Sequence, residues 1–226
     1  MVVQLPALDL QVRQRQRALA GLRELLSALF FHGLAGSGSE WDRLQARIPA
    51  RAPDLRPTGT RDEYVADAVA LIDTGPVTLI GQSLGGHTAF LVAARRPDLA
   101  ERLIVIEASP ERGPEGPDRV RQALLANPSP YGSELDPDAA AAALAQIAER
   151  DFWGEWAQIR CPVLVVRGER GDMSRQVAER MCAQLERARL VEIPGAGHDV
   201  HLDQPAALAA SIEEFVQEST PRTSST

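Results

Sequence analysis

The first candidate catalytic residue is Ser83, which lies at the centre of the pattern G-x-S-x-G over residues 81–85. The pattern directly follows the apolar run 77–80 and opens a helical pattern that ends near Arg95. A turn between a buried strand and a helix is the setting in which this pattern presents a nucleophilic serine, because the turn strains the serine backbone and lifts its hydroxyl out of the fold. A β-carbon at either flanking glycine would crowd the helix against the strand. We therefore predict that Ser83 is a nucleophile; the alternative is a glycine-rich turn with an incidental serine.

A serine hydroxyl is a weak nucleophile and needs a neighbouring base. Of the four histidines, His198 is the best placed, because it ends the glycine-containing loop 194–198 between the apolar run 190–193 and the last helix. His87 lies one turn into the helix after the serine and should face away from it, and His201 falls beside the start of the last helix. We predict that His198 is the base; the alternative is a loop histidine that bonds to the backbone.

The third group required is a carboxylate that holds the imidazole in one tautomer and stabilises the imidazolium. Asp172 follows the apolar run 163–166 and gives the chain order serine, aspartate, histidine. Glu169 lies three residues nearer to that run, and Glu107 ends another apolar run, so both stay open as alternatives. We predict Asp172 as the orienting acid.

Attack by a serine on an acyl carbon creates an oxyanion, which preorganised N–H groups must stabilise. One donor should be the backbone N–H of Leu84, the residue after the predicted nucleophile. The other should come from residues 30–38, where glycine and alanine allow the backbone to approach a substrate closely, and we assign it to Leu34. His32, in the same segment, is expected to orient this loop rather than to act as a second base.

Aromatic side chains near this loop and in the segment 110–158 are candidates for substrate contact. They are Phe31, Phe152, Trp153 and Trp156. For the last three, ordinary packing on the core is the alternative. An apolar pocket would favour hydrophobic acyl or aryl esters over charged metabolites.

Strand and helix patterns alternate along the chain, which predicts an α/β fold with a mostly parallel sheet and helices on both faces. Short apolar runs indicate four buried strands and a weaker fifth. They span residues 25–31, 77–80, 103–106, 163–166 and 190–193. Helices are expected after the capping-box pair Thr60 and Glu63, over 84–95, over 177–185 and from Pro205 onward.

The domain plan is one core interrupted by one insertion. The assignments are residues 1–109 and 159–218 for the core, 110–158 for a cap insertion over one end of the sheet, and 219–226 for a disordered tail. The insertion differs from the core in its many proline, glycine and alanine residues. Near the N-terminus, residues 8–12 alternate apolar and polar side chains and favour an edge strand, whereas 14–26 fit either a strand or a helix.

Composition and charge narrow the choice of partners. A chain of 226 residues suits one domain, and a net charge of −7 disfavours nucleic acid and anionic membranes as partners.

The two cysteines, Cys161 and Cys182, are too few for a disulfide framework and too isolated for a metal site, so we expect them in the core. No run is long enough to span a membrane, and the N-terminus lacks a secretory signal pattern, so a cytoplasmic location is expected. The oligomeric state stays open.

Four motifs, in order along the chain, carry a resemblance to a known family. They are His32-Gly33 followed by Trp41, residues 81–86 (GQSLGG), residues 161–169 (CPVLVVRGE) and residues 195–198 (GAGH). Together they resemble the α/β-hydrolase superfamily, in its esterase- and lipase-like branch with a small helical cap, over residues 25–216. The resemblance implies an eight-stranded sheet core and no cofactor. The sequence departs from the family in the acid loop, where one extra residue separates Gly168 from Asp172, and in segment 54–60, where the family's Asp-x-x-Gly-x-Gly stretch is shortened.

These residues and the resemblance together predict a serine hydrolase that acts on a small-molecule carboxylic ester or thioester through an acyl-enzyme on Ser83. One alternative is a lyase or C–C bond hydrolase that uses Ser83 and His198 without a covalent intermediate. Another is a binding module of the same fold that does no catalysis. A dehalogenase is disfavoured, because it would need a carboxylate at position 83. Neither a metal nor a cofactor is expected.

Overall fold

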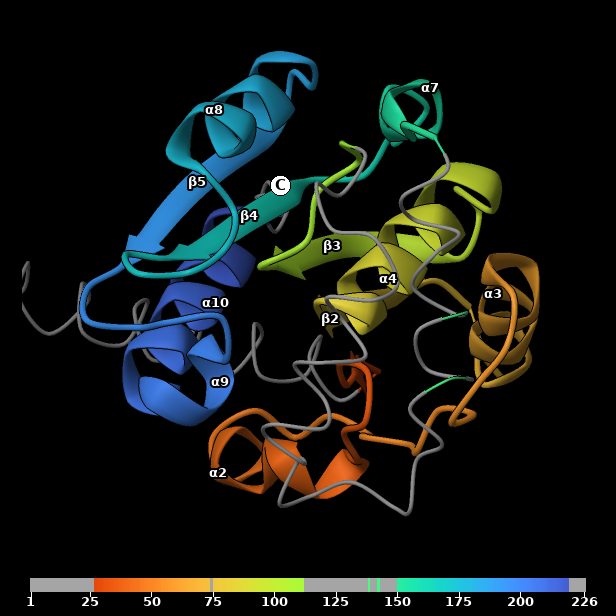
Figure 1. Ribbon diagram of the computed structural model, residues 1–226, viewed down its shortest axis with the longest axis horizontal. Helices are drawn as coiled ribbons and strands as arrows, with labels where there is room; N and C mark the ends of the chain where they lie inside the picture. The colour runs from red at the N-terminus through yellow and green to blue at the C-terminus, as the bar shows by residue number, and fades with distance from the viewer. Residues whose placement is uncertain (1–26, 74, 112–137, 139–141, 143–149, 220–226) are drawn as a thin grey trace, which may run out of the picture.

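A parallel sheet of five strands forms the centre of the described part of the chain (Figure 1). The computed structural model describes residues 27–73, 75–111, 138, 142 and 150–219. Its strands are β1 (Leu29–Phe31), β2 (Val77–Gln82), β3 (Ala100–Ile106), β4 (Val163–Gly168) and β5 (Ala188–Ile193). They lie side by side in chain order, and each pairs in parallel with the next. The strands predicted from the five apolar runs are confirmed, β1 over Leu29–Phe31 of its run, and the parallel order brings all five carboxyl ends to one edge of the sheet.

Several expectations fall on residues that the structure does not describe. These include the edge strand over 8–12, the ambiguous segment 14–26 and most of the cap insertion. The resemblance implied eight strands, of which the described residues contain five. Ser219, which the domain plan assigned to the tail, is the last residue of the C-terminal helix. Its Oγ accepts a hydrogen bond of 2.7 Å from Arg102 Nε, which holds the end of that helix against β3.

Helices connect the strands and cover both faces of the sheet. The helical elements are η1 (Gly38–Trp41), α2 (Asp42–Gln45), α3 (Arg61–Ala70), α4 (Leu84–Arg95), α7 (Trp153–Trp156), α8 (Arg175–Ala183), α9 (Val200–Asp203) and α10 (Pro205–Ser219). The capping box that predicted α3 is present: the side chain of Thr60 accepts from the Glu63 N–H, and the Glu63 carboxylate accepts from the Thr60 N–H. The helices predicted over 84–95, over 177–185 and from Pro205 are also confirmed.

Two hydrophobic cores lie on opposite faces of the sheet, because successive strand residues point to opposite sides. Leu29 and Phe31 of β1 belong to the core under α3, α4, α7 and α8. Phe30, between them, belongs to the core under η1, α2, α9 and α10. In Figure 1, α9 and α10 lie beside α2 on this second side. None of the helices in the described residues combines the length and apolar character needed to cross a membrane.

The described end of the expected insertion packs on the first core. Phe152 is buried, and its N–H donates to the carbonyl of Pro110 at 2.7 Å. Trp156 in α7 is fully buried, and its indole N–H donates to the carbonyl of Met181 in α8 at 3.0 Å. The described end of the insertion, which includes α7, therefore contacts both α4 and α8 and is part of the core.

Candidate active site

Ser83 lies in a strained turn between β2 and α4. Its backbone has φ 50° and ψ −116°, in a region that residues with a β-carbon rarely adopt. A β-carbon at Gly81 would lie 2.2 Å from the carbonyl oxygen of Gly85, and one at Gly85 would lie 2.2 Å from the carbonyl oxygen of Phe31. The expected backbone strain and the need for both glycines are confirmed. A strained, sharply defined turn of this kind holds the serine side chain at the carboxyl edge of the sheet.

The loop that carries His198 is tied to this turn by the residue before the serine. Gln82 is buried, and its Nε2 donates to the carbonyl oxygen of His198 and to Oδ1 of Asp199, each at 3.2 Å. The other end of the Gln82 amide lies against Gly33, where a β-carbon would meet its Oε1 at 2.3 Å. Gln82 thus joins three segments: the serine turn, the histidine loop and the loop after β1. Sequence reasoning assigned no role to Gln82, although a long polar side chain at the end of a buried strand was a signal.

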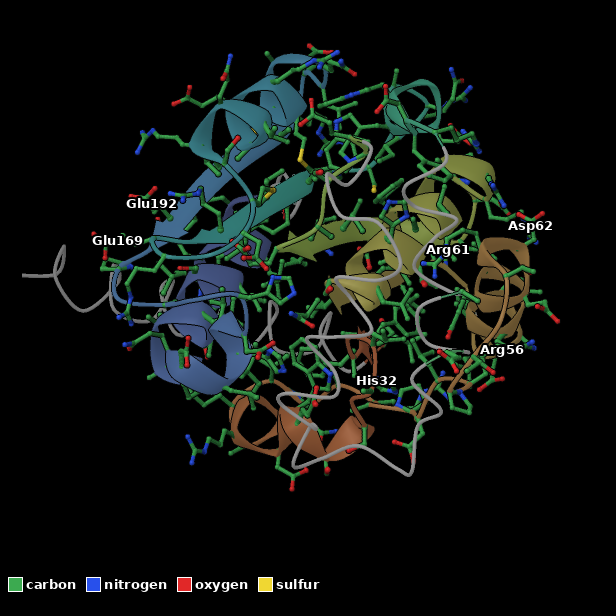
Figure 2. The ribbon with its side chains drawn as sticks, viewed as in Figure 1. His32, Arg56, Arg61, Asp62, Glu169 and Glu192 are labelled. Atoms are coloured by element: carbon green, nitrogen blue, oxygen red, sulfur yellow. The ribbon has the colours of Figure 1, made fainter. Side chains whose placement is uncertain are left out.

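Two carboxylates lie next to the imidazole of His198. Oδ2 of Asp172 is 3.2 Å from His198 Nδ1, and Oε2 of Glu107 is 3.5 Å from the same nitrogen. Their environments differ, since the Asp172 side chain is 84% exposed and the Glu107 side chain is fully buried. Glu169, the third candidate, is directed elsewhere: its Oε2 accepts from the Gly195 N–H at 2.8 Å, and Figure 2 shows it at the outer end of β4 and β5.

Glu107 also builds the loop that carries Asp172. Its carboxylate accepts backbone hydrogen bonds from Gly168 at 2.8 Å, from Asp172 at 2.7 Å and from Met173 at 3.0 Å. Gly171 leaves the necessary room, because a β-carbon there would lie 2.3 Å from the carboxylate. Glu107 has φ 49°, a second strained backbone position at the edge of the sheet. The Glu107 carboxylate therefore holds the backbone of the loop that presents Asp172.

The surroundings of His198 set its protonation. Burial by itself would lower the pKa of the imidazole. The adjacent Glu107 carboxylate and the charges of Asp172 and Asp199 outweigh this effect, so the pKa of His198 lies above its ordinary value of 6.5. Nδ1 faces the carboxylates, which leaves Nε2 as the nitrogen that can exchange a proton with another group.

The loop after β1 lines a pocket of about 230 Å³. Leu34 and Leu84, whose N–H groups are the predicted oxyanion donors, both belong to its wall. His32, labelled in Figure 2, holds the loop in place as expected. Its Nε2 accepts from the Leu55 N–H at 2.8 Å, so its Nδ1 carries the proton and donates to the carbonyl oxygen of Gly33 at 2.7 Å. Both ring nitrogens of His32 are therefore engaged in shaping the loop.

The pocket wall carries one guanidinium and one carboxylate, and both are held by other groups of the protein. Its one guanidinium belongs to Arg56, which donates to both carboxylate oxygens of Asp67 and pairs with Glu63 at 3.0 Å. The carboxylate of Asp54, also on the wall, accepts from the Gly38 N–H at 2.7 Å. The rest of the wall includes Leu34, Leu55, Pro57, Tyr64 and Leu84. Such a wall suits a small neutral group better than an anion.

None of the four aromatic residues predicted to contact substrate lines this pocket. Phe31, Phe152 and Trp156 are buried in the first core. Trp153 is partly buried, and the guanidinium of Arg180 lies over its ring at 4.0 Å from the centroid. For these side chains, core packing accounts for the observed positions.

The remaining histidines have structural surroundings. His87 is buried in α4 between Phe90, at 4.4 Å between ring centroids, and Phe152, at 4.8 Å. Burial lowers its pKa to about 3. His201 is buried in α9 and stacks on Trp41 at 4.5 Å. His198 is thus the histidine that lies beside Asp172 and Glu107, and its carbonyl oxygen is bound by Gln82, the residue before Ser83.

Thiol chemistry and metal binding have little support in the described residues. Cys161 and Cys182 are free, and burial raises the pKa of their thiols to about 12 and about 11. Neither is therefore an activated nucleophile at neutral pH. No group of three or more histidine, cysteine, aspartate or glutamate side chains in this part of the chain is arranged to hold a metal ion.

Comparison with known proteins agrees with this geometry. A model of the alpha/beta hydrolase family matches residues 28–211. The chain belongs to the alpha/beta hydrolase family. Its α/β fold with a parallel sheet and flanking helices is the fold of that family, and the chain is a hydrolase.

Two relatives and two solved structures illustrate the similarity. The chain is 28% identical to 2-(acetamidomethylene)succinate hydrolase of Mesorhizobium japonicum, across 83% of this chain and 87% of that protein. It is 34% identical to lipase LipV of Mycobacterium tuberculosis, across 60% of this chain and 53% of the lipase. A thermophilic esterase from Thermogutta terrifontis shares the fold with a TM-score of 0.71 and 23% identity, over 85% of this chain and 90% of the esterase. MenH from S. aureus does so with a TM-score of 0.69 and 18% identity, over 85% and 91% of the two chains.

Proposed function

We propose that this hydrolase cleaves a carboxylic ester through a covalent acyl-enzyme on Ser83. The observation that carries the proposal is the strained backbone of Ser83 at the sheet edge, in a turn that Gln82 ties to the loop of a histidine whose Nδ1 faces two carboxylates. A serine becomes nucleophilic when a base accepts its proton, and a base does so best when a third group fixes its tautomer. The relatives that are hydrolases, among them a lipase, are consistent with this chemistry.

In the proposed reaction, Nε2 of neutral His198 accepts the Ser83 Oγ proton as Oγ attacks the ester carbon. The oxyanion that forms accepts hydrogen bonds from the N–H groups of Leu34 and Leu84. The imidazolium then gives its proton to the departing alcohol, which leaves the acyl group on Ser83. Water attacks this acyl group with His198 again as the base, and the carboxylic acid product leaves with the enzyme restored.

We assign the orienting acid to Asp172, which has the shorter contact with His198 Nδ1. Glu107 adds a second, buried negative charge on the same side of the ring. Because the Glu107 carboxylate already accepts three backbone hydrogen bonds, its first task is to shape the loop that presents Asp172. The imidazolium that forms during attack would be stabilised by both charges.

The pocket favours a neutral acyl or alkoxy group of modest size. Its guanidinium and carboxylate are both engaged by the protein, and its other side chains are mainly apolar. The same machinery would act on a thioester, because the attacked carbon and the developing oxyanion are equivalent. A series of p-nitrophenyl esters with acyl chains of increasing length would define the acyl preference.

The decisive experiment is labelling with a fluorophosphonate, followed by mass spectrometry of the digested protein. The expected result is a covalent adduct on Ser83 and none on Ser83→Ala, with turnover of p-nitrophenyl acetate lower by several orders of magnitude in the variant. An unlabelled wild type, or substantial ester hydrolysis by Ser83→Ala, would contradict the proposal. A lyase or C–C bond hydrolase without a covalent intermediate predicts no acyl-enzyme after rapid quenching with an ester, which separates the two chemistries.

A further inference from the structure

A buried carboxylate and a buried imidazole meet behind the loop after β1, and the proposed mechanism uses neither. Glu40 in η1 is 7% exposed, and His201 in α9 is 1% exposed. Nε2 of His201 lies 3.3 Å from Oε2 of Glu40. In the tautomer that carries its proton on Nε2, the imidazole donates this hydrogen bond to the carboxylate oxygen. Nδ1 of His201 is buried and has no hydrogen-bond partner in the described residues. Within this part of the chain, Glu40 is therefore the hydrogen-bond partner of the His201 ring.

Stacked aromatic rings hold the imidazole of His201 in place. It stacks on Trp41 at 4.5 Å between ring centroids, with 28° between the planes. Trp41 stacks in turn on Phe30 of β1 at 4.6 Å and 8°. This stack of rings, which begins on strand β1, therefore fixes the orientation of the His201 ring, and Nε2 of His201 points toward η1.

Glu40 lies directly against the backbone of the loop that carries Leu34. A β-carbon at Gly36 would lie 2.7 Å from each oxygen of the Glu40 carboxylate. The N–H of Gly36 donates to the carbonyl oxygen of Gly33 at 3.2 Å, which closes a turn around Leu34. A displacement of the Glu40 side chain would therefore shift the peptide groups on either side of Leu34.

His201 is equally close to the segment that carries His198. The N–H of Gly197 donates to Oδ2 of Asp203 at 2.7 Å, and the N–H of Leu202 donates to the carbonyl oxygen of Asp199 at 2.9 Å. The histidine loop and α9 therefore form one hydrogen-bonded unit, and η1 packs against α9. The contact between Glu40 and His201 joins this unit to the loop after β1.

We propose that Glu40 and His201 are a positioning pair, which sets the distance between the base His198 and the oxyanion donor Leu34. The inference rests on the roles proposed above for His198 and Leu34. Neither member of the pair touches the reacting atoms, and each acts through the backbone of a loop. A misplacement of about 1 Å can cost about 100-fold in rate. Loss of the hydrogen bond that joins the two loops should therefore lower kcat.

Two substitutions of His201 separate positioning from packing. His201→Phe keeps the ring on Trp41 and removes the donor, whereas His201→Gln removes the ring and keeps an N–H donor near the Nε2 position. We expect kcat to fall about tenfold or more in His201→Phe, with KM within about twofold, and to be partly retained in His201→Gln. We expect the melting temperature to be higher in His201→Phe than in His201→Gln, which is the reverse of the order expected for kcat. If kcat follows the same order as the melting temperature, the pair serves packing alone and the proposal is wrong.

Further variants separate a general loss of stability from a loss of positioning. Ile212→Val, in the buried face of α10, should lower the melting temperature while kcat stays at the wild-type value. Glu40→Gln combined with His201→Phe should lower kcat no further than the worse single variant, because the two residues act as one unit. Loss of activity in Ser83→Ala together with full kcat in His201→Phe would overturn the positioning role and leave the proposed reaction standing. Full activity in Ser83→Ala would overturn the proposed reaction itself.

Discussion

The carboxylate of Glu107 accepts a hydrogen bond of 2.7 Å from the backbone N–H of Asp172, so the two acids beside His198 depend on one another. Asp172 approaches the imidazole from solvent, and Glu107 approaches it from the core. Removing the charge of Asp172 leaves the loop intact, whereas changing Glu107 also removes acceptors for backbone N–H groups. Rate and stability must therefore be measured together to assign the acid.

We expect Asp172→Asn to lower kcat by about 10² to 10⁴, because the imidazole loses the charge that orients it and stabilises its protonated form. The melting temperature should stay near that of the wild type, since the Asp172 side chain is exposed. Glu107→Gln should lower both kcat and the melting temperature, because an amide N–H₂ would face backbone N–H groups. Steady-state kinetics and thermal unfolding of the two variants provide the measurement.

Glu169→Gln is the matched control, since its carboxylate contacts the Gly195 N–H on the surface. It should leave kcat unchanged. The assignment of Asp172 would be wrong if Asp172→Asn kept the wild-type kcat while Glu107→Gln lost activity without a change in melting temperature.

The pH dependence of kcat/KM should report the protonation of His198. Activity requires the neutral imidazole, so kcat/KM should rise with pH through the pKa of this residue. Burial opposes the charged form, but Glu107, Asp172 and Asp199 outweigh it, which places the midpoint above 6.5. In Asp172→Asn, one negative charge is lost, the imidazolium is less stabilised and the midpoint should move to lower pH. A flat profile between pH 5 and 8, or a shift to higher pH in this variant, would count against His198 as the base.

Two glycine substitutions test the tight packing of the serine turn. In Gly85→Ala, the new β-carbon would meet the backbone carbonyl oxygens of Phe31 and His32 at 2.2 and 2.5 Å, and backbone cannot rotate away as a side chain can. We expect a loss of about 3 kcal/mol or more in the free energy of unfolding. Gly154→Ala in α7 is the control, because a β-carbon there meets nothing within 4 Å. It should be neutral or stabilising by up to about 1 kcal/mol. Similar stabilities for the two variants in urea denaturation would contradict the packing argument.

His87 should make the folded state sensitive to acid. Its pKa is about 3 because it is buried, and the charge of Arg61 adds to the effect. Below pH 6.5 the unfolded chain gains a proton on this side chain while the folded chain does not, so the free energy of unfolding falls as the pH falls toward 3. The contribution is about 1.4 kcal/mol per pH unit. His87→Leu should lose this part of the slope between pH 6 and 4, measured by urea denaturation. Identical slopes in the two proteins would show that His87 is not held neutral.

Features that depend on neighbours along the chain could be predicted from the amino-acid sequence. The five strands, the capping box at Thr60 and the glycines around Ser83 follow from local periodicity and from the steric needs of a tight turn. Parallel pairing was also implied, because strands that alternate with helices are joined by helical crossovers, whereas the order of the strands came from the structure. These features are local, so a sequence pattern of a few residues is enough to predict them.

Contacts between segments far apart in the chain could be identified only in the folded protein. Glu107 and Asp172 are 65 residues apart, and the parallel pairing of β3 with β4 brings both to the same imidazole. The pairing of Glu40 with His201 joins residues 161 positions apart, and no spacing rule predicts it. The residue types of Phe152 and Trp156 fit either contact with a substrate or packing in the core. Their burial follows from how α7 packs against α4. Such contacts depend on the relative placement of whole elements, which is set by the sum of many packing interactions and not by any short pattern.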